Sequence, residues 1–524
     1  MWNPPIALTL EEHKIAARTR QARKFFVFWR EHRHAWLDAA FQATLAATYS
    51  AEPGGTAPVE AGLLALATLV QAYGHVGAQD AVALTGMDKR WQMVLDGLGA
   101  EPPPCSQGTR YNLRMRLMAH NLDKIVLERT VTVAEQTGGF GARQLRAALD
   151  ATPLFGAGRV EDTLNLLGHA VRKAVGLAAR ALGASAEALL EEAGWVLVGH
   201  RSRKAALDLD WGHPKARAQA LRLVLAEVER WQTWLAQHQR LVEGVPPLQD
   251  VMDTIAQIGT PDTEPAPDGG PGGTRLKKQV APERRISMED ADMRHGRKRS
   301  TTMCNGCKEH FGLDLDSHVT REVVVRPANE PEQAAVELLV ETLEKPPGLL
   351  QLAIALGDMA SPRIMQWAEQ GVSIMARPWP PGGALFTKDA FTLDFAHGTR
   401  TGPGGQTVPM VLGTDAQFPA SACDRCPQRA QGTTARLGQG RSLHIREDEP
   451  FQHKLRTKSK TKRGRASLRK RTAVEHAISH HIAHQGRRAR SKGLRKNQFD
   501  GRRHAAVSNL QVAAHYVEEL QPAS

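Results

Sequence analysis

The sequence of 524 residues predicts a mixed α/β core domain, preceded by an all-α domain and interrupted by an α-helical insertion. Short apolar segments of strand length occur at residues 144–154 and 349–358, and a candidate hairpin precedes the second of them. Apolar residues recur every three or four positions through most of residues 8–145 and 160–243, as in amphipathic helices. From residue 310 onwards the expected order is strand, strand, helix, strand, which is typical of a mixed sheet.

Residues 1–140 are expected to form the helical N-terminal domain. Pro/Gly-rich breaks at residues 51–58 and 101–104 separate its helices. Helical periodicity is clearest in EAGLLALATLVQAYGHV and RYNLRMRLMAHNLDKIVLERTVTVAEQ. Basic residues recur in RKFFVFWREHRH and TRYNLRMRL, so a DNA-binding helical module and a plain helical bundle both fit this pattern.

The core domain is expected in two pieces, residues 141–158 and 285–378. Its first strand, QLRAALDATPL, should place Asp150 at the C-terminal end of the strand, just before a Thr-Pro pair. A helical insertion at residues 159–258 and a Pro/Gly-rich flexible linker at 259–284 should separate the two pieces. In the second piece, the candidate strands HFGLDLDS and HVTREVVVRPA are followed by a helix, PEQAAVELLVETLEK, and by a buried strand, LLQLAIALGD, that ends in Asp358.

The C-terminal part combines a Gly/Pro-rich, β-like insertion at residues 379–445 with a basic helical segment at 446–524. The formal net charge of the chain is +13, and residues 451–504 hold 18 Lys and Arg but only two acids, Glu475 and Asp500. Such a cationic segment usually marks a polyanionic partner, nucleic acid first. A solvated basic tail is the alternative. Apolar residues of VEHAISHHI recur at helical spacing, which indicates that part of the segment packs as a helix.

The sequence lacks the usual signs of export or membrane insertion. The N-terminus does not show the basic-then-apolar pattern of a signal peptide, and no run of 18 apolar residues occurs. Five irregularly spaced cysteines are too few for a secreted disulfide framework. A cytoplasmic protein without a membrane partner is therefore expected.

Three carboxylates stand out as candidate metal ligands. Asp150 and Asp358 each end an apolar strand, and Glu475 lies on the basic helix. Carboxylates at strand ends can meet at one edge of a sheet, and a facing helix can supply a third. Mg²⁺ prefers such oxygen ligands together with substrate phosphate oxygens, and two ions about 3.5–4 Å apart can support phosphoryl transfer. A single acid at a strand end is more often a cap or a salt-bridge partner than a metal ligand.

Five blocks of sequence, in order, carry a resemblance to one known family. They are LLALATLVQAYGHVGAQDAVALTGMDKRWQMVLDGLG, ALDATPLFGAGRVEDTLNLL, SMEDADMRHGRKRSTTMCNGCKEHFGLDLDS, ANEPEQAA with ALGDMASP, and RKRTAVEHAISHH with SKGLRKNQFDGRRHAAVSNL. Each block alone is weak, but their order and spacing together are specific. From about residue 30 to 515 the chain resembles bacterial insertion-sequence transposases of the DDE type.

The resemblance implies an RNase H-like catalytic domain that binds two Mg²⁺ ions, for which Mn²⁺ can substitute. By position, Asp150 corresponds to the first aspartate, Asp358 to the second and Glu475 to the glutamate, all three as metal ligands. A metal-bound water would cut the ends of the protein's own mobile element, and the released 3′-OH would attack target DNA. Arg471 falls where relatives often keep an arginine near DNA phosphate. Three further cations are expected to contact phosphate as a group: Lys492, Arg495 and Lys496.

The partners implied by the resemblance are double-stranded DNA, as inverted-repeat ends and as target, and further copies of the chain assembled on it. The place of action would be the bacterial cytoplasm, at the nucleoid when DNA is bound. Two alternatives share the same residues. One is a catalytically decayed or repurposed transposase that binds DNA without cutting. The other is a metal-dependent nuclease that performs no strand transfer.

Two CxxC pairs raise the question of a zinc site. Cys304 and Cys307 are more than a hundred residues from Cys423 and Cys426, which exceeds ordinary zinc-ribbon spacing. The first pair is interpreted as incidental core thiols. The second resembles a cysteine cluster of the family, but TGPGG and RAQG stand where relatives often have further cysteines. This departure leaves half of the ligand set and argues against a structural zinc.

Overall fold

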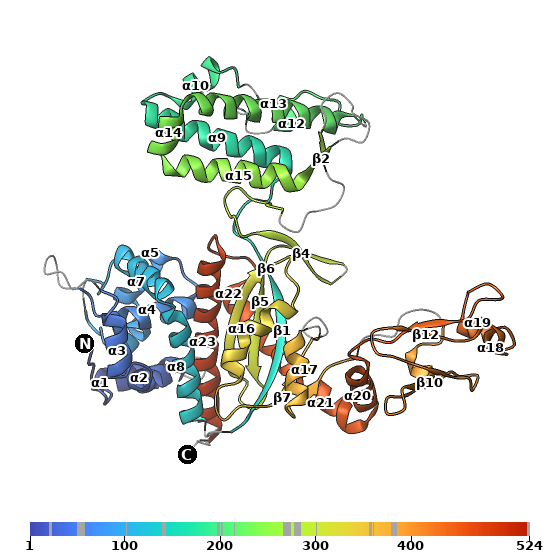
Figure 1. Cartoon of the computed structure of the whole chain (residues 1–524). Coiled ribbons are helices and arrows are strands. Elements are labelled where there is room, and N and C mark those ends of the chain that lie inside the picture. Colours follow the sequence, from blue (N-terminus) through green and yellow to red (C-terminus); the bar gives the residue numbers. More distant parts are fainter. Residues whose placement is uncertain are drawn as a thin grey trace.

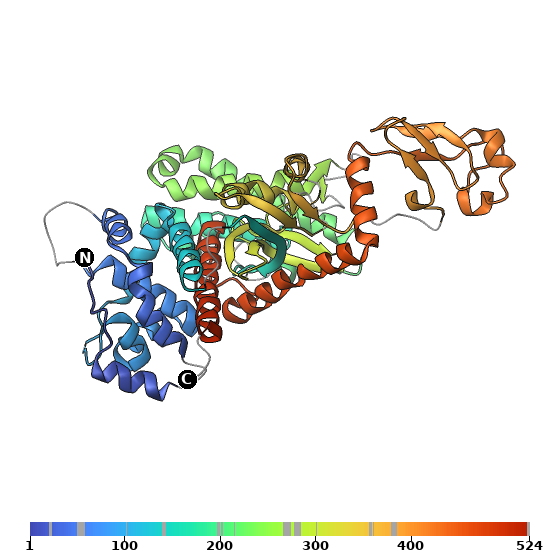
Figure 2. The same ribbon diagram turned by 90° about the horizontal axis from the view of Figure 1, so that it is seen from below.

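The computed structural model describes most of the chain, and its parts gather around one mixed sheet (Figure 1). The described residues are 1–19, 24–49, 58–100, 102–138, 143–195, 197, 200, 203–213, 215–265, 274–276, 284–299, 301–355, 359, 361–378 and 385–520. N-terminal helices lie against one side of the sheet region, a separate helical block lies beyond one end of the strands, and a β-rich arm projects away from the core (Figures 1 and 2).

The N-terminal part is helical, as expected from its periodicity. Its helices are α1 (Leu10–Arg18), α2 (Lys24–Trp36), α3 (Ala39–Ala46), α4 (Ala61–Gly74), α5 (Ala78–Met87), α6 (Lys89–Leu95), α7 (Gln107–Ala119) and α8 (Leu122–Thr137). A capping box between Thr9 and Glu12 starts α1, because each side chain bonds the other residue's backbone N–H. The buried Arg30 of α2 donates to Glu12 at 2.5 Å, which ties the first two helices together.

The central sheet is mixed, which confirms the predicted α/β class of the core. Its strands are β1 (Leu145–Phe155), β4 (Arg294–Arg299), β5 (Thr302–Asp314), β6 (Thr320–Pro327), β7 (Leu349–Ala353) and β8 (Ser373–Met375). The order is β4-β5-β1-β7-β8, with β6 also pairing with β5. β1 is antiparallel to β5 and parallel to β7, and β7 is parallel to β8. β5 and β6 are antiparallel neighbours, so the expected hairpin is present.

Helices cover both faces of this sheet. The long C-terminal helix α23 (Leu494–Leu520) lies between α8 and β6, so it joins the N-terminal helices to the sheet (Figure 1). On the same face, α22 (Thr472–Gln485) packs against β1 and β5. The opposite face belongs to a second apolar core, which includes residues of three helices: α16 (Gln333–Leu343), α17 (Pro362–Glu369) and α20 (Glu449–Lys460).

Two expected boundaries differ from the structure. β1 does not end near Asp150 but continues to Phe155, because residues up to Phe155 stay paired with β5. The carboxylate therefore lies in the interior of the strand and not at its C-terminal end. The segment expected as a flexible linker contains the end of α15 (Pro246–Asp262) and the paired strands β2 (Thr263–Pro265) and β3 (Thr274–Leu276).

The helical block and the β-rich arm each have an apolar core of their own. Besides α15, the block contains α9 (Thr163–Leu182), α10 (Ala186–Glu192), α12 (Arg203–Ala206), α13 (Ala216–Gln237) and α14 (Gln239–Gly244). The arm contains the 3₁₀ helix η3 (Lys388–Ala390), β9 (Thr392–Asp394), β10 (Thr399–Thr401), β11 (Thr407–Pro409), β12 (Asp415–Gln417), α18 (Ala420–Asp424), α19 (Arg429–Gly432) and β13 (Ser442–His444). The basic helix α21 (Lys462–Lys470) connects α20 to α22.

None of the described helices is by itself both long enough and apolar enough to cross a membrane, although α4 and α5 would be as a pair bent by 105°.

Candidate active site

Asp150 reaches the candidate site because of the alternation of side chains along β1. Ala147 and Leu149 belong to the apolar core on one face of the sheet, and Ala148 belongs to the core on the other face. Since side chains alternate along a strand, Asp150 points to the same face as Ala148. That is the face on which α22 packs.

The start of α22 brings Arg471 and Glu475 to this carboxylate. Val474 and Ile478 are buried in the same apolar core as Ala148, which fixes the helix against the sheet. Arg471 immediately precedes α22 and lies four residues before Glu475, so the two side chains share one side of the helix. The Arg471 guanidinium donates from Nη1 to Asp150 Oδ2 at 2.8 Å and from Nη2 to Glu475 Oε1 at 2.5 Å. One guanidinium thus joins two carboxylates that are 325 positions apart in sequence.

A lysine and a further glutamate complete the site, and neither was among the predicted residues. Lys298 of β4 donates from Nζ to Asp150 Oδ1 and to Glu332 Oε1, both at 3.0 Å. Glu332 is the N-cap residue of α16. The position of Lys298 depends on the pairing of β4 with β5, and no local sequence motif indicates this contact.

The electrostatics of the site keep its central carboxylate ionised. Burial alone would raise the pKa of Asp150, but the Lys298 ammonium, the Ala151 backbone N–H and the Arg471 guanidinium together lower the pKa below its usual range. Burial likewise acts to lower the pKa of Lys298, and the carboxylates of Asp150 and Glu332 outweigh it and raise the pKa. The Asp150 carboxylate and the Lys298 ammonium are therefore both charged at neutral pH.

These residues line an open cleft of about 820 Å³. Glu475 is half exposed to it, whereas Asp150 is mostly buried in its wall. Cations dominate the remaining polar lining, which includes Arg377, Arg465 and Arg469. A cleft with basic walls and carboxylates among them suits a phosphodiester substrate, because the cations attract the backbone while the acids remain available as ligands.

The donor chemistry of Asp150 and Glu475 fits a hard divalent cation. Mg²⁺ in phosphoryl-transfer sites is usually held by one or two carboxylates plus substrate phosphates, without a closed cage of protein ligands. Among the residues that the structure describes, no group of three or more His, Cys, Asp or Glu side chains could hold a metal ion on its own. The third predicted ligand, Asp358, lies outside the described residues. The structure therefore brings two of the three predicted carboxylates into one cleft.

The other predicted DNA contacts lie away from this cleft, toward the start of α23. The Lys492 ammonium is half exposed and pairs with Glu289 at 2.9 Å. Arg495 donates to Asp123 at 3.1 Å and to the Met118 carbonyl at 2.8 Å, so this guanidinium connects α23 to the N-terminal helices. The third member of the predicted group, Lys496, is exposed.

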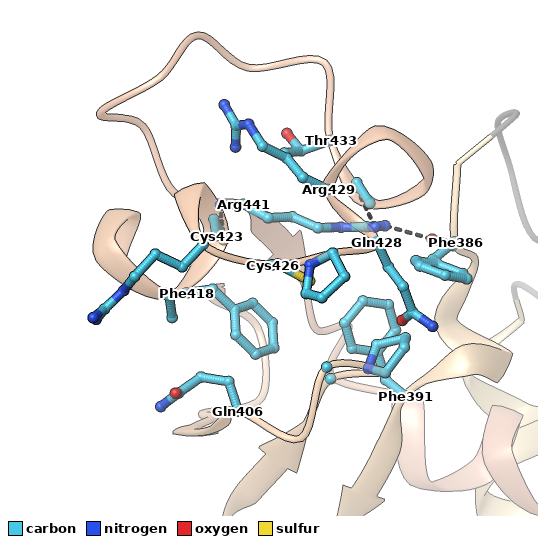
Figure 3. Close-up of a pocket in the computed structure, with 17 residues that line it drawn as sticks. Phe386, Phe391, Gln406, Phe418, Cys423, Cys426, Gln428, Arg429, Thr433 and Arg441 are labelled. Atoms are coloured by element: carbon cyan, nitrogen blue, oxygen red, sulfur yellow. Dashed lines mark hydrogen bonds between the residues drawn. The ribbon is translucent and has the colours of Figure 1, made fainter.

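The four cysteines of the CxxC pairs lie in two different environments. Cys304 and Cys307 are buried beside β1, as core thiols should be, and burial raises the pKa of Cys304 to about 11. Cys423 and Cys426 line a pocket of about 270 Å³ in the β-rich arm, between aromatic rings and arginine side chains (Figure 3). There the Arg441 backbone N–H donates to the Cys423 sulfur at 3.4 Å.

Of three comparisons with known proteins, one gave a match. A search of the curated proteins found no match, and a search of the solved structures found none either. Residues 412–514 match the family model of the transposase DDE domain. The matched range contains Arg471 and Glu475 and ends within α23, whereas Asp150 lies outside it. Residues 412–514 of this chain thus match a transposase DDE domain, which supports the prediction that the protein is a DDE transposase.

Proposed function

We propose that this protein is a DNA transposase that cuts the ends of its own insertion sequence and joins the released 3′-OH to target DNA. One observation carries the proposal. Asp150 and Glu475, far apart in sequence, share the Arg471 guanidinium in a basic cleft, and Glu475 lies within the matched DDE domain. A binding surface for DNA phosphate would not by itself require acids among its cations.

The topology of the sheet supports an RNase H-like core. Along the path β6-β5-β1-β7-β8, β5 is antiparallel to both β6 and β1, and β7 and β8 run parallel to β1. β1, the first strand in sequence, is thus the central one, with the β5–β6 hairpin on one side and the parallel strands β7 and β8 on the other. This arrangement places Asp150 at the middle of the sheet, where a helix on the same face can bring Glu475 to it.

Asp150, Glu475 and Asp358 would hold the divalent ions. Bound Mg²⁺ or Mn²⁺ would activate the attacking oxygen and stabilise the leaving oxygen of the phosphodiester. Arg471, whose guanidinium lies between the two described carboxylates, would bind a phosphate oxygen of the DNA. Lys492, Arg495 and Lys496 would extend the phosphate contacts along the duplex.

The remaining parts of the chain would serve assembly on DNA. The exposed cations of α21 continue the basic lining of the cleft toward the arm. The N-terminal helices would bind the inverted-repeat ends, and a homo-oligomer would hold two ends together in the bacterial cytoplasm. A DNA-binding protein that no longer cuts is the second candidate, because Lys298 and Arg471 occupy oxygens of Asp150 that a metal ion would need.

A joining assay with matched DNA ends tests the proposal. Duplexes carrying the ends that flank the gene would be supplied already cut, with either a 3′-OH or a 3′-deoxy terminus, together with a supercoiled target plasmid and Mg²⁺. We expect joined products only from the 3′-OH ends, because that hydroxyl is the nucleophile of strand transfer. Cutting of uncut ends without any joining would indicate the nuclease instead, and binding without either reaction would indicate the non-cutting protein.

A further inference from the structure

We propose that Lys298 is a positioning residue that holds the Asp150 carboxylate in the metal-free protein and transfers to Glu332 when a divalent ion binds. The inference rests on the proposed function, because it assumes that Asp150 is a metal ligand. It adds two residues, Lys298 and Glu332, to the machinery of the site. It also gives the site a defined arrangement before the metal arrives.

The geometry around the ammonium group carries the inference. Lys298 Nζ is 3.0 Å from Asp150 Oδ1 and 3.0 Å from Glu332 Oε1, so it is shared equally between two carboxylates. The side chains of Lys298, Asp150 and Glu332 are 20%, 12% and 13% exposed. A mostly buried ammonium must keep a charged or hydrogen-bonding partner, because a buried charge without a partner destabilises the folded protein.

A divalent ion and the ammonium compete for the same carboxylate. Asp150 Oδ1 accepts from Lys298 and from the Ala151 backbone N–H at 2.7 Å, while Oδ2 accepts from Arg471. A metal ion bound to this carboxylate would repel the neighbouring ammonium, and the repulsion is strong away from bulk water. The Lys298 ammonium must then move away from Oδ1.

Glu332 provides the place to which the ammonium can move. It already binds Lys298, and its backbone is held at the start of α16. The lysine side chain is a flexible stem with a point charge, so a small rotation can favour one carboxylate over the other. The Lys298–Glu332 contact thereby keeps the charge paired while Asp150 is released to the metal.

Replacing Lys298 and replacing Glu332 should change the affinity for Mn²⁺ in opposite directions. In Lys298→Met no ammonium competes for Asp150, so the affinity for Mn²⁺ should rise by on the order of tenfold, as expected for the loss of one charged hydrogen bond. In Glu332→Gln the ammonium keeps only Asp150 as a charged partner, so the affinity should fall by a similar factor. A purely structural role would lower the affinity in both variants.

The double variant separates transfer of the ammonium from a simple charge effect. If Lys298 and Glu332 act only through their charges at a distance, the two effects cancel, and Lys298→Met combined with Glu332→Gln binds Mn²⁺ like the wild type. If the ammonium transfers, Glu332 has no role once Lys298 is gone, and the double variant binds like Lys298→Met alone. Arg469→Met removes an exposed cation from the same cleft and should change the affinity by about twofold or less, because exposed charges are screened.

The experiment is a titration of the full-length proteins with Mn²⁺ in the absence of DNA, with free Mn²⁺ followed by electron paramagnetic resonance. Asp150→Asn identifies the binding that belongs to this site. Opposite shifts in the single variants, with a double variant that matches Lys298→Met, are the expected result. If Asp150→Asn lowers Mn²⁺ binding but the double variant matches the wild type, the transfer is wrong and the metal site stands. If Asp150→Asn leaves Mn²⁺ binding unchanged, the metal site fails, and with it the inference.

Discussion

Replacing Glu309 by glutamine should remove a pH-dependent loss of stability from the sheet beneath α22. Glu309 lies on β5 and is 1% exposed. Its Oε1 accepts from Gln485 Nε2 of α22 at 2.8 Å, so this carboxyl group helps to hold the helix that carries Glu475. Burial raises the pKa of Glu309 to about 8. The hydrogen bond from Gln485 acts to lower this pKa, and the negative charge of Asp500 acts to raise it.

The sign and size of the effect follow from proton linkage. The pKa of Glu309 rises from an ordinary value of 4.5 in the unfolded chain to about 8 in the folded protein, so the folded state keeps the proton longer. The contribution of Glu309 to the free energy of unfolding is fully present below pH 4.5 and is lost as the pH rises toward 8. Each pKa unit corresponds to about 1.4 kcal/mol, so the loss between pH 5.5 and 8 is on the order of 3 kcal/mol. Glutamine carries no such proton but can still accept the hydrogen bond from Gln485.

Urea unfolding of the wild type and of Glu309→Gln at pH 5.5 and pH 8 measures this difference. The variant should gain on the order of 3 kcal/mol relative to the wild type between the two pH values. Glu337→Gln is the control, because it makes the same substitution at a half-exposed carboxylate on the opposite side of the sheet, where the effect on stability should be small. An equal difference between Glu309→Gln and wild type at both pH values would refute the reasoning.

Three further predictions concern the frame of the site, its DNA contacts and its thiols. Arg502→Met should lower the free energy of unfolding by about 3–5 kcal/mol, measured in urea, because it leaves the buried Glu322 of β6 without its cation and removes one of the two guanidiniums that bind Asp123 of α8. Lys492→Ala should leave stability unchanged. Titrations at several salt concentrations should show that the slope of log DNA affinity against log salt falls by the equivalent of about one phosphate contact. In timed alkylation followed by mass spectrometry, Cys423 and Cys426 should react before Cys304, whose pKa is raised to about 11 by burial; faster labelling of Cys304 would contradict its place in the core.

The order of strands and helices could be predicted from the sequence, but the extent of β1 could not. Apolar pattern and strand length located β1, the β5–β6 hairpin, α16 and β7. The Thr-Pro pair after Asp150 suggested an early end of the first strand. Pairing with β5 carries the strand past Pro153 to Phe155 instead, so long-range pairing overrides the local signal.

The candidate site was predictable only in part. The acids could be chosen from strand ends and from the resemblance. The ion pair between Arg471 and Glu475 agrees with their spacing of four residues, but it was not predicted. Lys298 and Glu332 could not be found in this way. Their meeting depends on the register of β4 against β5 and on where α16 starts relative to β1, and both are properties of the folded sheet.

The most direct test of the active-site assignment compares DNA cutting by wild type, Glu475→Gln and Glu447→Gln. Glu447 is an exposed acid near the base of the arm, so Glu447→Gln makes the same charge change away from the cleft. The DNA carries the ends that flank the gene, Mg²⁺ is present, and gel-shift assays verify equal binding. We predict that Glu475→Gln cuts at least about 100-fold more slowly while binding DNA like the wild type, because a metal ligand is lost without loss of phosphate contacts. Cutting by Glu475→Gln at the rate of Glu447→Gln would contradict the placement of this carboxylate in the active site.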